Sequence, residues 1–383
     1  MIRAAMNDEL KQLKAYPKAR LEARKAKILA RGIRLHDFGT GDPSEPTPAF
    51  IRQALIDAVP EESRYSTVQG HADLRRATAS YLRRRFGIDV DADSEILPTS
   101  GSMEAVFHLP LILVDGSKDQ NLVVYGEPAY KVFEISSLFA GARPHGHLLH
   151  DSDSYLLRPE QLGEETLGRT AMVILNYPHN PSGQVLPPEV FESWVEARDR
   201  HGFVLVSDEA YCDLYFEEPP RTLLEFGRKG CLSLYSLSKR SGMTGYFTGF
   251  LAGDPELITT LKRYRQSMGL SSPIWTQAAA TAAWSDEAHV DERRAIFAEK
   301  RRILLEMCER LGLRVYPSTA ALFLWIQVPG SETDQSYAEK LLDHGILVSP
   351  GSFYGPDQER YIRVALSPTV EECREAARDW PRV

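Results

Sequence analysis

Short apolar runs alternate with amphipathic stretches through the middle of the chain. The runs at 121–125, 173–176 and 203–207 have the length and composition of buried strands. Between them, 130–139 and 189–201 carry apolar residues at helical spacing. Strands that alternate with helices in this way are typical of an α/β fold, so the pattern predicts a mostly parallel, doubly wound sheet.

The sequence predicts that the chain is divided into three structural parts. The first 45 residues read as an N-terminal arm and part of a small domain, with a charged helix at about 7–31 that is interrupted at Tyr16-Pro17. Residues 46–280 form the predicted large domain, and residues 281–383 the small C-terminal one. The small domain is predicted as a compact α+β unit, with a strand at 321–328, a helix at 337–343 and a strand at 361–366. Three further helices are expected at 50–58, 73–86 and 291–311.

Composition narrows the class of protein. The chain has 383 residues, 43% hydrophobic and 26% charged, which is the balance of a soluble globular protein. A net charge of −8 argues against general affinity for nucleic acid or anionic membrane, and the basic clusters 83–85 and 300–302 read as solvated helix faces. Four widely spaced cysteines give no metal signature. Neither a signal peptide nor a membrane span is expected, so we predict a cytoplasmic protein.

Lys239 is the most informative candidate for chemistry. It follows the apolar run 232–235 and lies in Ser236-Leu237-Ser238-Lys239. A lysine held out of bulk water can stay partly neutral, and a neutral amine attacks a carbonyl to form an imine. The two serines can donate hydrogen bonds to a phosphate. Imine formation beside a phosphate site indicates pyridoxal 5'-phosphate (PLP), although such a run alone is more often a simple turn.

Two upstream motifs strengthen this interpretation. The run 173–175 leads into a segment that contains Asn180, and the run 203–206 leads into a segment that contains Asp208. In open α/β sheets, ligands bind beyond the carboxyl ends of the strands. We therefore expect Asn180, Asp208 and Lys239 to meet in one crevice.

In their order and spacing, these motifs resemble the class I and II aminotransferases, which are PLP enzymes of fold type I. The resemblance covers nearly the whole chain and implies a large domain with a seven-stranded type of sheet. It rests on Gly41-Asp42-Pro43, Tyr65, Gly101, Pro128-x-Tyr130, Asn180-Pro-Ser-Gly183, Asp208-x-Ala-Tyr211, Ser236-x-Ser-Lys239 and Arg363.

The resemblance implies a role for each residue around the cofactor ring. Lys239, Asp208 and Tyr211 are the expected catalytic residues. Lys239 would form the internal aldimine and then move the proton from the substrate Cα to the cofactor. Asp208 would keep the pyridine nitrogen protonated, so that the ring accepts electrons. Asn180 and Tyr211 would hydrogen-bond the ring oxygen, and Tyr130 would stack on the ring.

The phosphate would be bound at the start of a helix. Gly101, Ser102 and Met103 open that helix, so their backbone N–H groups can cradle an anion. Ser236 and Ser238 would add hydroxyl donors.

Other expected residues lie further from the ring. Tyr65 would reach the phosphate in a neighbouring subunit, which implies a homodimer with shared sites. Gly41, Asn180 and Arg363 form the expected substrate-binding set. Arg363 interrupts an apolar strand, where it reads either as a structural ion pair or, as the family pattern favours, as a clamp on the substrate α-carboxylate.

Phe247 departs from the family pattern. It stands eight residues after Lys239, where the family usually has a phosphate-binding arginine. The loss of a charge-assisted contact would weaken cofactor binding by roughly 1.5–3 kcal/mol. Three explanations are open: the other donors suffice, another cation such as Arg240 compensates, or the protein has moved away from efficient transamination.

Several stretches look most similar to the branch that acts on N-succinyl-diaminopimelate in lysine biosynthesis. They are 236–241, 249–254, 115–117 and 13–17. Rival interpretations are a PLP-dependent C–S lyase or amino-acid oxidase on the same scaffold, and the effector domain of a PLP-sensing regulator. Three histidines, His145, His147 and His150, read as part of a surface connection rather than a metal site.

Overall fold

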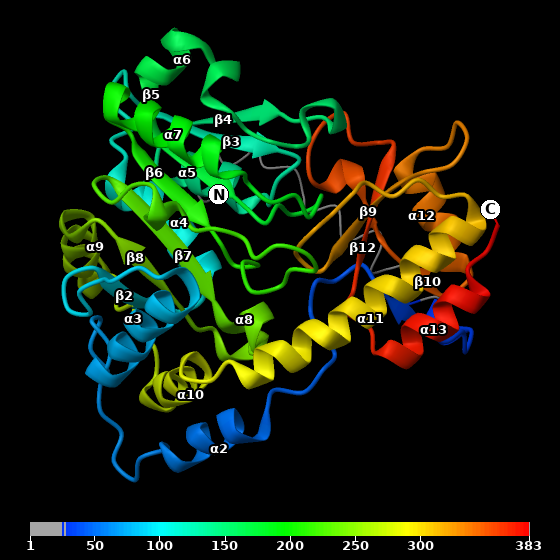
Figure 1. The fold of residues 1–383 in the computed structure, drawn as a ribbon, viewed down its shortest axis with the longest axis horizontal. Coiled ribbons are helices and arrows are strands. Elements are labelled where there is room, and N and C mark those ends of the chain that lie inside the picture. Colours follow the sequence, from blue (N-terminus) through cyan, green and yellow to red (C-terminus); the bar gives the residue numbers. More distant parts are fainter. Residues whose placement is uncertain (1–24, 27, 383) are drawn as a thin grey trace, which may run out of the picture.

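A seven-stranded sheet forms the largest layer of the structure, a computed structural model that describes residues 25–26 and 28–382 (Figure 1). Its strand order is β2-β8-β7-β6-β5-β3-β4. Strand β8 runs antiparallel to β2 and β7, and the other neighbours are parallel. The strands are β2 (Ile96–Thr99), β3 (Leu122–Glu127), β4 (Arg143–Leu148), β5 (Thr170–Asn176), β6 (Val204–Asp208), β7 (Cys231–Ser236) and β8 (Gly249–Gly253).

Helices cover both faces of this sheet because successive strand residues point to opposite sides. In β5, Val173 and Leu175 pack in the core that contains Trp194 of α7, whereas Ile174 packs in the core of α4, α5 and α9. The mostly parallel, doubly wound α/β fold is thus confirmed. The helices of this part are α2 (Ala49–Asp57), α3 (Ala72–Phe86), α4 (Ser102–Leu113), α5 (Val132–Phe139), α6 (Gly163–Arg169), α7 (Pro188–His201), α8 (Leu237–Arg240), α9 (Pro255–Ser267) and α10 (Ile274–Trp284).

A second, smaller sheet follows in the C-terminal part, with strand order β11-β12-β9 and antiparallel pairing (Figure 1). It packs with three helices around one apolar core. A two-stranded parallel pair, β1 with β10, joins the N-terminal segment to this part. The elements are β1 (His36–Asp37), α11 (Ala288–Leu311), β9 (Phe323–Gln327), α12 (Asp334–Asp343), β10 (Ile346–Leu347), β11 (Ser349–Pro350), β12 (Tyr361–Ala365) and α13 (Val370–Asp379).

Short 3-10 helices connect several of these elements. They are η2 (Asp151–Asp153), η3 (Pro159–Gln161), η4 (Leu223–Glu225), η5 (Thr244–Tyr246) and η6 (Gly351–Phe353). The division at residues 45 and 280 stays a prediction. The predicted helix at 7–31 lies largely outside the described residues, as does the stretch 13–17.

One strand was missed from the sequence, and the interpretation of its histidines as a surface connection is wrong. Residues 143–148 form the edge strand β4, which pairs in parallel with β3 and carries His145 and His147. Glycine suits position 146 of this strand, because a side chain there would collide with Glu127. A Cβ at this position would lie 2.5 Å from the Glu127 side chain. Within the described part of the chain, no group of three or more His, Cys, Asp or Glu residues could hold a metal.

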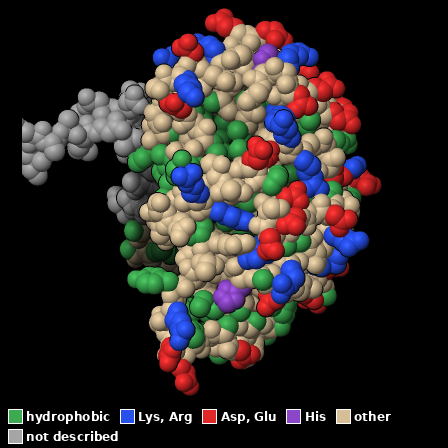
Figure 2. Space-filling view, turned by 90° about the vertical axis from the view of Figure 1, so that its left-hand side faces the viewer, with side chains coloured by type: hydrophobic (Ala, Val, Ile, Leu, Met, Phe, Trp, Pro, Cys, Tyr) green, Lys and Arg blue, Asp and Glu red, His purple; other side chains and the backbone are tan. Residues whose placement is uncertain are grey.

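The basic clusters are only partly solvated. Figure 2 shows Lys and Arg side chains interspersed with Asp and Glu over one face. However, Lys300 is fully buried and its Nζ lies 2.5 Å from Glu45. Arg85 turns inward as well and pairs with Asp213 at 3.0 Å. The prediction was wrong for these two residues because their partners come from distant parts of the chain. No helix among the described residues is long and apolar enough to cross a membrane.

Candidate active site

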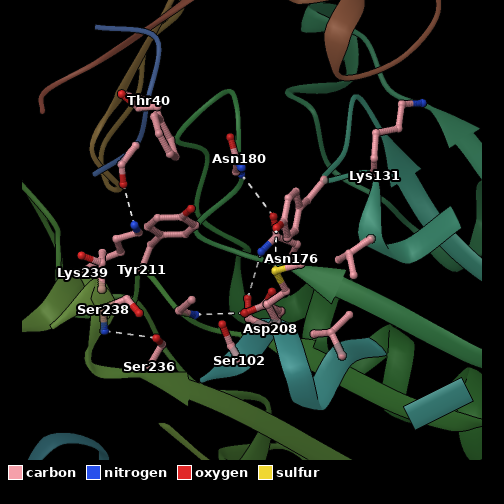
Figure 3. Close-up of a pocket in the computed structure, with 18 of the residues that line it drawn as sticks. Thr40, Ser102, Lys131, Asn176, Asn180, Asp208, Tyr211, Ser236, Ser238 and Lys239 are labelled. Atoms are coloured by element: carbon pink, nitrogen blue, oxygen red, sulfur yellow. Dashed lines mark hydrogen bonds between the residues drawn. The ribbon is translucent and has the colours of Figure 1, made fainter. Parts of the chain in front are cut away.

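A cavity of about 390 Å³ opens where the carboxyl ends of the large-sheet strands face the small sheet. Twelve of the thirteen site residues expected from the sequence line it. Figure 3 shows how several of them face one another. The twelve are Gly41, Gly101, Ser102, Met103, Tyr130, Asn180, Asp208, Tyr211, Ser236, Ser238, Lys239 and Arg363.

Tyr65 is the exception. It lies between α2 and α3 with a fully exposed side chain, away from the cavity of its own chain. Its expected role in a neighbouring subunit stays a prediction.

Lys239 lies on the short helix α8, directly after β7. Ser236 caps this helix, since its hydroxyl accepts a hydrogen bond of 3.2 Å from the backbone N–H of Ser238. The Lys239 Nζ donates to the carbonyl of Gly41 at 2.5 Å. Burial lowers the pKa of Lys239 to about 8, an effect that Asp42 opposes and Arg363 supports. The amine is therefore mostly neutral in mildly alkaline solution, as a nucleophile requires.

Asp208 is the last residue of β6, and its buried carboxylate accepts few hydrogen bonds. The backbone N–H of Ala210 donates to its Oδ1 at 3.2 Å and is its one hydrogen-bond donor among residues 25–26 and 28–382. Burial raises the pKa of Asp208 to about 6. A carboxylate in this state is stabilised by any cationic hydrogen-bond donor that enters the cavity.

Asn176 connects two of the site residues and was not recognised from the sequence. Its Nδ2 donates to the carbonyl of Asp208 at 3.3 Å, and its Oδ1 accepts from the backbone N–H of Asn180 at 3.3 Å (Figure 3). The signal was present, because Asn176 ends an apolar run as Asp208 does.

Arg363 enters from β12 of the small sheet. Its two terminal nitrogens donate to Oδ1 of Asn180 at 3.0 Å and to the carbonyl of Gly39 at 2.8 Å. Phe323 and Tyr354 lie 4.3 Å and 4.9 Å from the guanidinium carbon and hold its plane. No carboxylate of the described residues pairs with it, so the structural ion pair is not what the geometry shows. Its Nε is buried without a partner in this part of the chain.

Neutral donors gather at the first turn of α4. Gly101 caps this helix with φ of +84°, a conformation that favours glycine. The N–H groups that follow are free of helical partners and suit an anion. Met103 lies beside them, and its sulfur accepts a hydrogen bond of 3.1 Å from the hydroxyl of Tyr130.

Arg240 does not take the place of the missing arginine, so the compensation suggested for this residue is wrong. It is buried next to Lys239 but turns away from the cavity. Its guanidinium lies 2.8 Å from Asp213 and 2.7 Å from Glu287. Phe247 itself lines the cavity, with 67% of its surface exposed.

Comparison with known proteins decides the family. The family model described as "Aminotransferase class I and II" matches residues 34–379. This chain belongs to the class I and II aminotransferases. It is 31% identical to an LL-diaminopimelate aminotransferase of Aquifex aeolicus over 97% of each chain. It is 38% identical to the 4-dedimethylamino-4-oxo-anhydrotetracycline transaminase OxyQ of Streptomyces rimosus, over 96% of this chain and 99% of the relative.

A solved aminotransferase from Neisseria meningitidis gives the same result in three dimensions. It is 34% identical, superposes with a TM-score of 0.90 and covers 98% of each chain. The fold-type I architecture, the aminotransferase class and the use of PLP are therefore confirmed for this aminotransferase.

PLP has four polar positions, which are the aldehyde, the ring nitrogen, the ring oxygen and the phosphate. The residues of the cavity fit the first three fully. The neutral amine of Lys239 suits an aldehyde, the unsupported carboxylate of Asp208 suits a protonated ring nitrogen, and the hydroxyl of Tyr211 lies in the same lining. At the phosphate position, the backbone of α4 and the two serines are suitable donors. The cation that would complete this position is absent from the cavity lining around Phe247.

Proposed function

We propose that this aminotransferase takes the amino group of glutamate and transfers it to a 2-oxo acid, with Lys239 as the residue that moves the proton. The observation that carries the proposal is the partly buried amine of Lys239, which lines one cavity with Asp208 and Arg363 and whose pKa is lowered to about 8. Bound PLP supplies an aldehyde and a ring that withdraws electrons from the substrate α-carbon.

The residues of the chain would divide the work between binding and proton transfer. Lys239 would hold the cofactor and, once released by the substrate amine, would take the proton from the α-carbon. Asp208, held in place by Asn176, would keep the ring nitrogen protonated. Tyr211 and Asn180 would donate to the ring oxygen, and Tyr130 would cover one face of the ring.

Arg363 would bind the substrate α-carboxylate. Two of its five N–H groups already donate to Asn180 and Gly39, so the unpartnered Nε–H and the remaining terminal N–H groups are available for two carboxylate oxygens. The neighbouring rings of Phe323 and Tyr354 restrict the orientation of this planar fork. The carbonyl of Gly39 and the turn at Gly41 would complete this end of the cavity.

We propose that the second substrate pair in the cell involves a diaminopimelate derivative, as in lysine biosynthesis. N-succinyl-LL-diaminopimelate would be the amino compound and 2-oxoglutarate the oxo acid. Support comes from the stretches 236–241 and 249–254 and from relatives named for LL-diaminopimelate. A second candidate is a bulky cyclic ketone, because Phe247, Phe353 and Tyr354 line the cavity and one relative is named for an oxo-anhydrotetracycline.

We also propose a homodimer, in which Tyr65 of a second copy would reach the phosphate position. Its full exposure in the single chain supports this assembly. The mass in solution tests it, and a Tyr65→Phe variant with weaker cofactor binding would support the shared site.

The absorbance of the protein with PLP tests the reaction. Addition of glutamate should remove the absorbance of the lysine-bound cofactor, and 2-oxoglutarate should restore it. A C–S lyase or an oxidase would turn over without an oxo acid, which would contradict transamination. A panel of N-succinyl-LL-diaminopimelate, LL-diaminopimelate and cyclic ketones then separates the substrate candidates. If only the last class reacts, the lysine pathway is excluded.

A further inference from the structure

Phe247 occupies the wall of the cavity that faces the first turn of α4. It follows η5 with φ of +48°, which is unusual for an aromatic residue. Its Cα and carbonyl carbon lie 4.0 Å from the position that a Cβ on Gly101 would take. A side chain at position 247 is therefore adjacent to the backbone donors that would bind the cofactor phosphate.

No free cation of the cavity lining compensates for this phenylalanine among the described residues. The lining contains Lys131, Lys239 and Arg363. Lys131 pairs with Glu134 at 3.3 Å, and Arg363 is held by Asn180 and Gly39 on the substrate side. Lys239 is the residue that bonds to the cofactor, and its free amine donates to the carbonyl of Gly41.

The charges behind the α4 turn also cancel. Glu104 in the first turn accepts a hydrogen bond of 3.1 Å from the backbone N–H of Ser100. Its negative charge is matched by a salt bridge with the buried Arg265. Within the cavity lining, the phosphate would thus be held by neutral donors, namely the N–H groups of Ser102 and Met103 and the hydroxyls of Ser236 and Ser238. A second copy's Tyr65 would add a hydroxyl and no charge.

We propose that this enzyme keeps its cofactor through the bond to Lys239 rather than through the phosphate, and that it releases the amino form, pyridoxamine 5'-phosphate, into solution. After the amino group has been received, Lys239 is free and no covalent bond remains. Retention then depends on the phosphate and ring contacts, which lack the charge-assisted contact that an arginine at position 247 would give. Phe247 sets this difference between the two cofactor forms. The inference rests on the cofactor placement proposed above.

The experiment measures retained cofactor and needs no turnover. Purified protein freed of cofactor is mixed with PLP or with pyridoxamine 5'-phosphate, passed through a desalting column, and the bound cofactor is quantified by absorbance after denaturation. We expect the native protein to retain PLP and to lose most of the amino form. In Phe247→Arg, the dissociation constant for pyridoxamine 5'-phosphate should fall about 10- to 100-fold.

Tyr264→Arg is the matched control. It adds the same charge at a half-exposed position of α9, outside the cavity lining, and should bind the amino form as the native protein does. The native protein alone also decides the matter if Phe247→Arg does not fold. Equal retention of both cofactor forms by the native protein would overturn the inference, as would an unchanged constant in folded Phe247→Arg. Because the amino form is added directly, a protein that does not react with glutamate still gives a result.

Discussion

Replacement of Arg363 by lysine tests the carboxylate clamp with the charge kept. The guanidinium makes two hydrogen bonds, of 3.0 Å to Asn180 and 2.8 Å to Gly39, and the rings of Phe323 and Tyr354 lie 4.3 Å and 4.9 Å from its central carbon. A lysine amine has no planar fork, so it cannot keep both partners and grip two carboxylate oxygens. The loss of two charge-assisted contacts at about 1.5 kcal/mol each costs about 3 kcal/mol, roughly 100-fold in kcat/KM.

The assay is the glutamate-driven loss of absorbance of the lysine-bound cofactor, measured against glutamate concentration. Arg363→Lys should need roughly 100-fold more glutamate for the same rate, while its spectrum with PLP stays native. The decarboxylated analogue 4-aminobutyrate has no α-carboxylate, so native protein and variant should react with it at the same slow rate.

Arg360→Lys is the control for general damage to the small sheet. Arg360 donates to backbone carbonyls of Val328, Gly330 and Glu332 and lies outside the cavity lining. It should leave the glutamate reaction unchanged. If Arg363→Lys slows glutamate and 4-aminobutyrate by the same factor, the arginine supports the fold and the clamp is refuted.

Three further predictions follow from buried groups. Lys239→Ala should lose the absorbance of the lysine-bound cofactor and all transamination; any retained turnover would contradict the proton-transfer role. Asp208→Ala should lose far more activity than bound cofactor. An equal loss of bound cofactor, measured by equilibrium dialysis, and of reaction rate would contradict the proposed role of Asp208. Burial raises the pKa of Glu209 from 4.5 to about 7, although Leu223 and Ser233 donate to its Oε1. The native state therefore loses about 3 kcal/mol of stability as the pH rises from about 4.5 through 7. Glu209→Gln should remove this slope in thermal unfolding, and an unchanged slope would rule the group out.

The sequence was sufficient to predict the strands that carry chemistry. Strands β5 and β6 contain continuous apolar runs and β7 is apolar apart from Ser233 and its last residue, as expected for strands buried on both faces, and polar residues follow each run. Their shared direction brings these polar ends to one edge. Strand β4 gave no such signal, since its sequence Arg-Pro-His-Gly-His-Leu has neither alternation nor β-branched residues. Pairing with β3 alone defines it.

Side-chain partners were the part that sequence could not supply. Nothing local distinguishes Arg85 from Arg84 in α3, yet the first pairs with Asp213, 128 positions away. Lys300 likewise finds Glu45 only after α11 packs against the N-terminal segment. The residues that shape the clamp, Phe323 and Tyr354, were not recognised, because an aromatic residue in a strand or loop gives no local signal of a binding site.

Lys239 and Arg240 show how the structure separates a functional charge from a structural one. They are neighbours on α8, where Arg240 is buried and Lys239 is partly buried. Arg240 has Asp213, Glu287 and two backbone carbonyls as partners, so folding alone satisfies its charge. Lys239 has one carbonyl acceptor and no carboxylate within hydrogen-bonding distance in the described part of the chain, and its pKa falls accordingly. Asp208 shows the same deficit with the opposite charge. Burial of groups in this state costs folding free energy, and a ligand that supplies the missing partners recovers that cost. Lys239 and Asp208 line one cavity, so a single ligand can satisfy both charges, and this shared lining, rather than burial by itself, marks the active site.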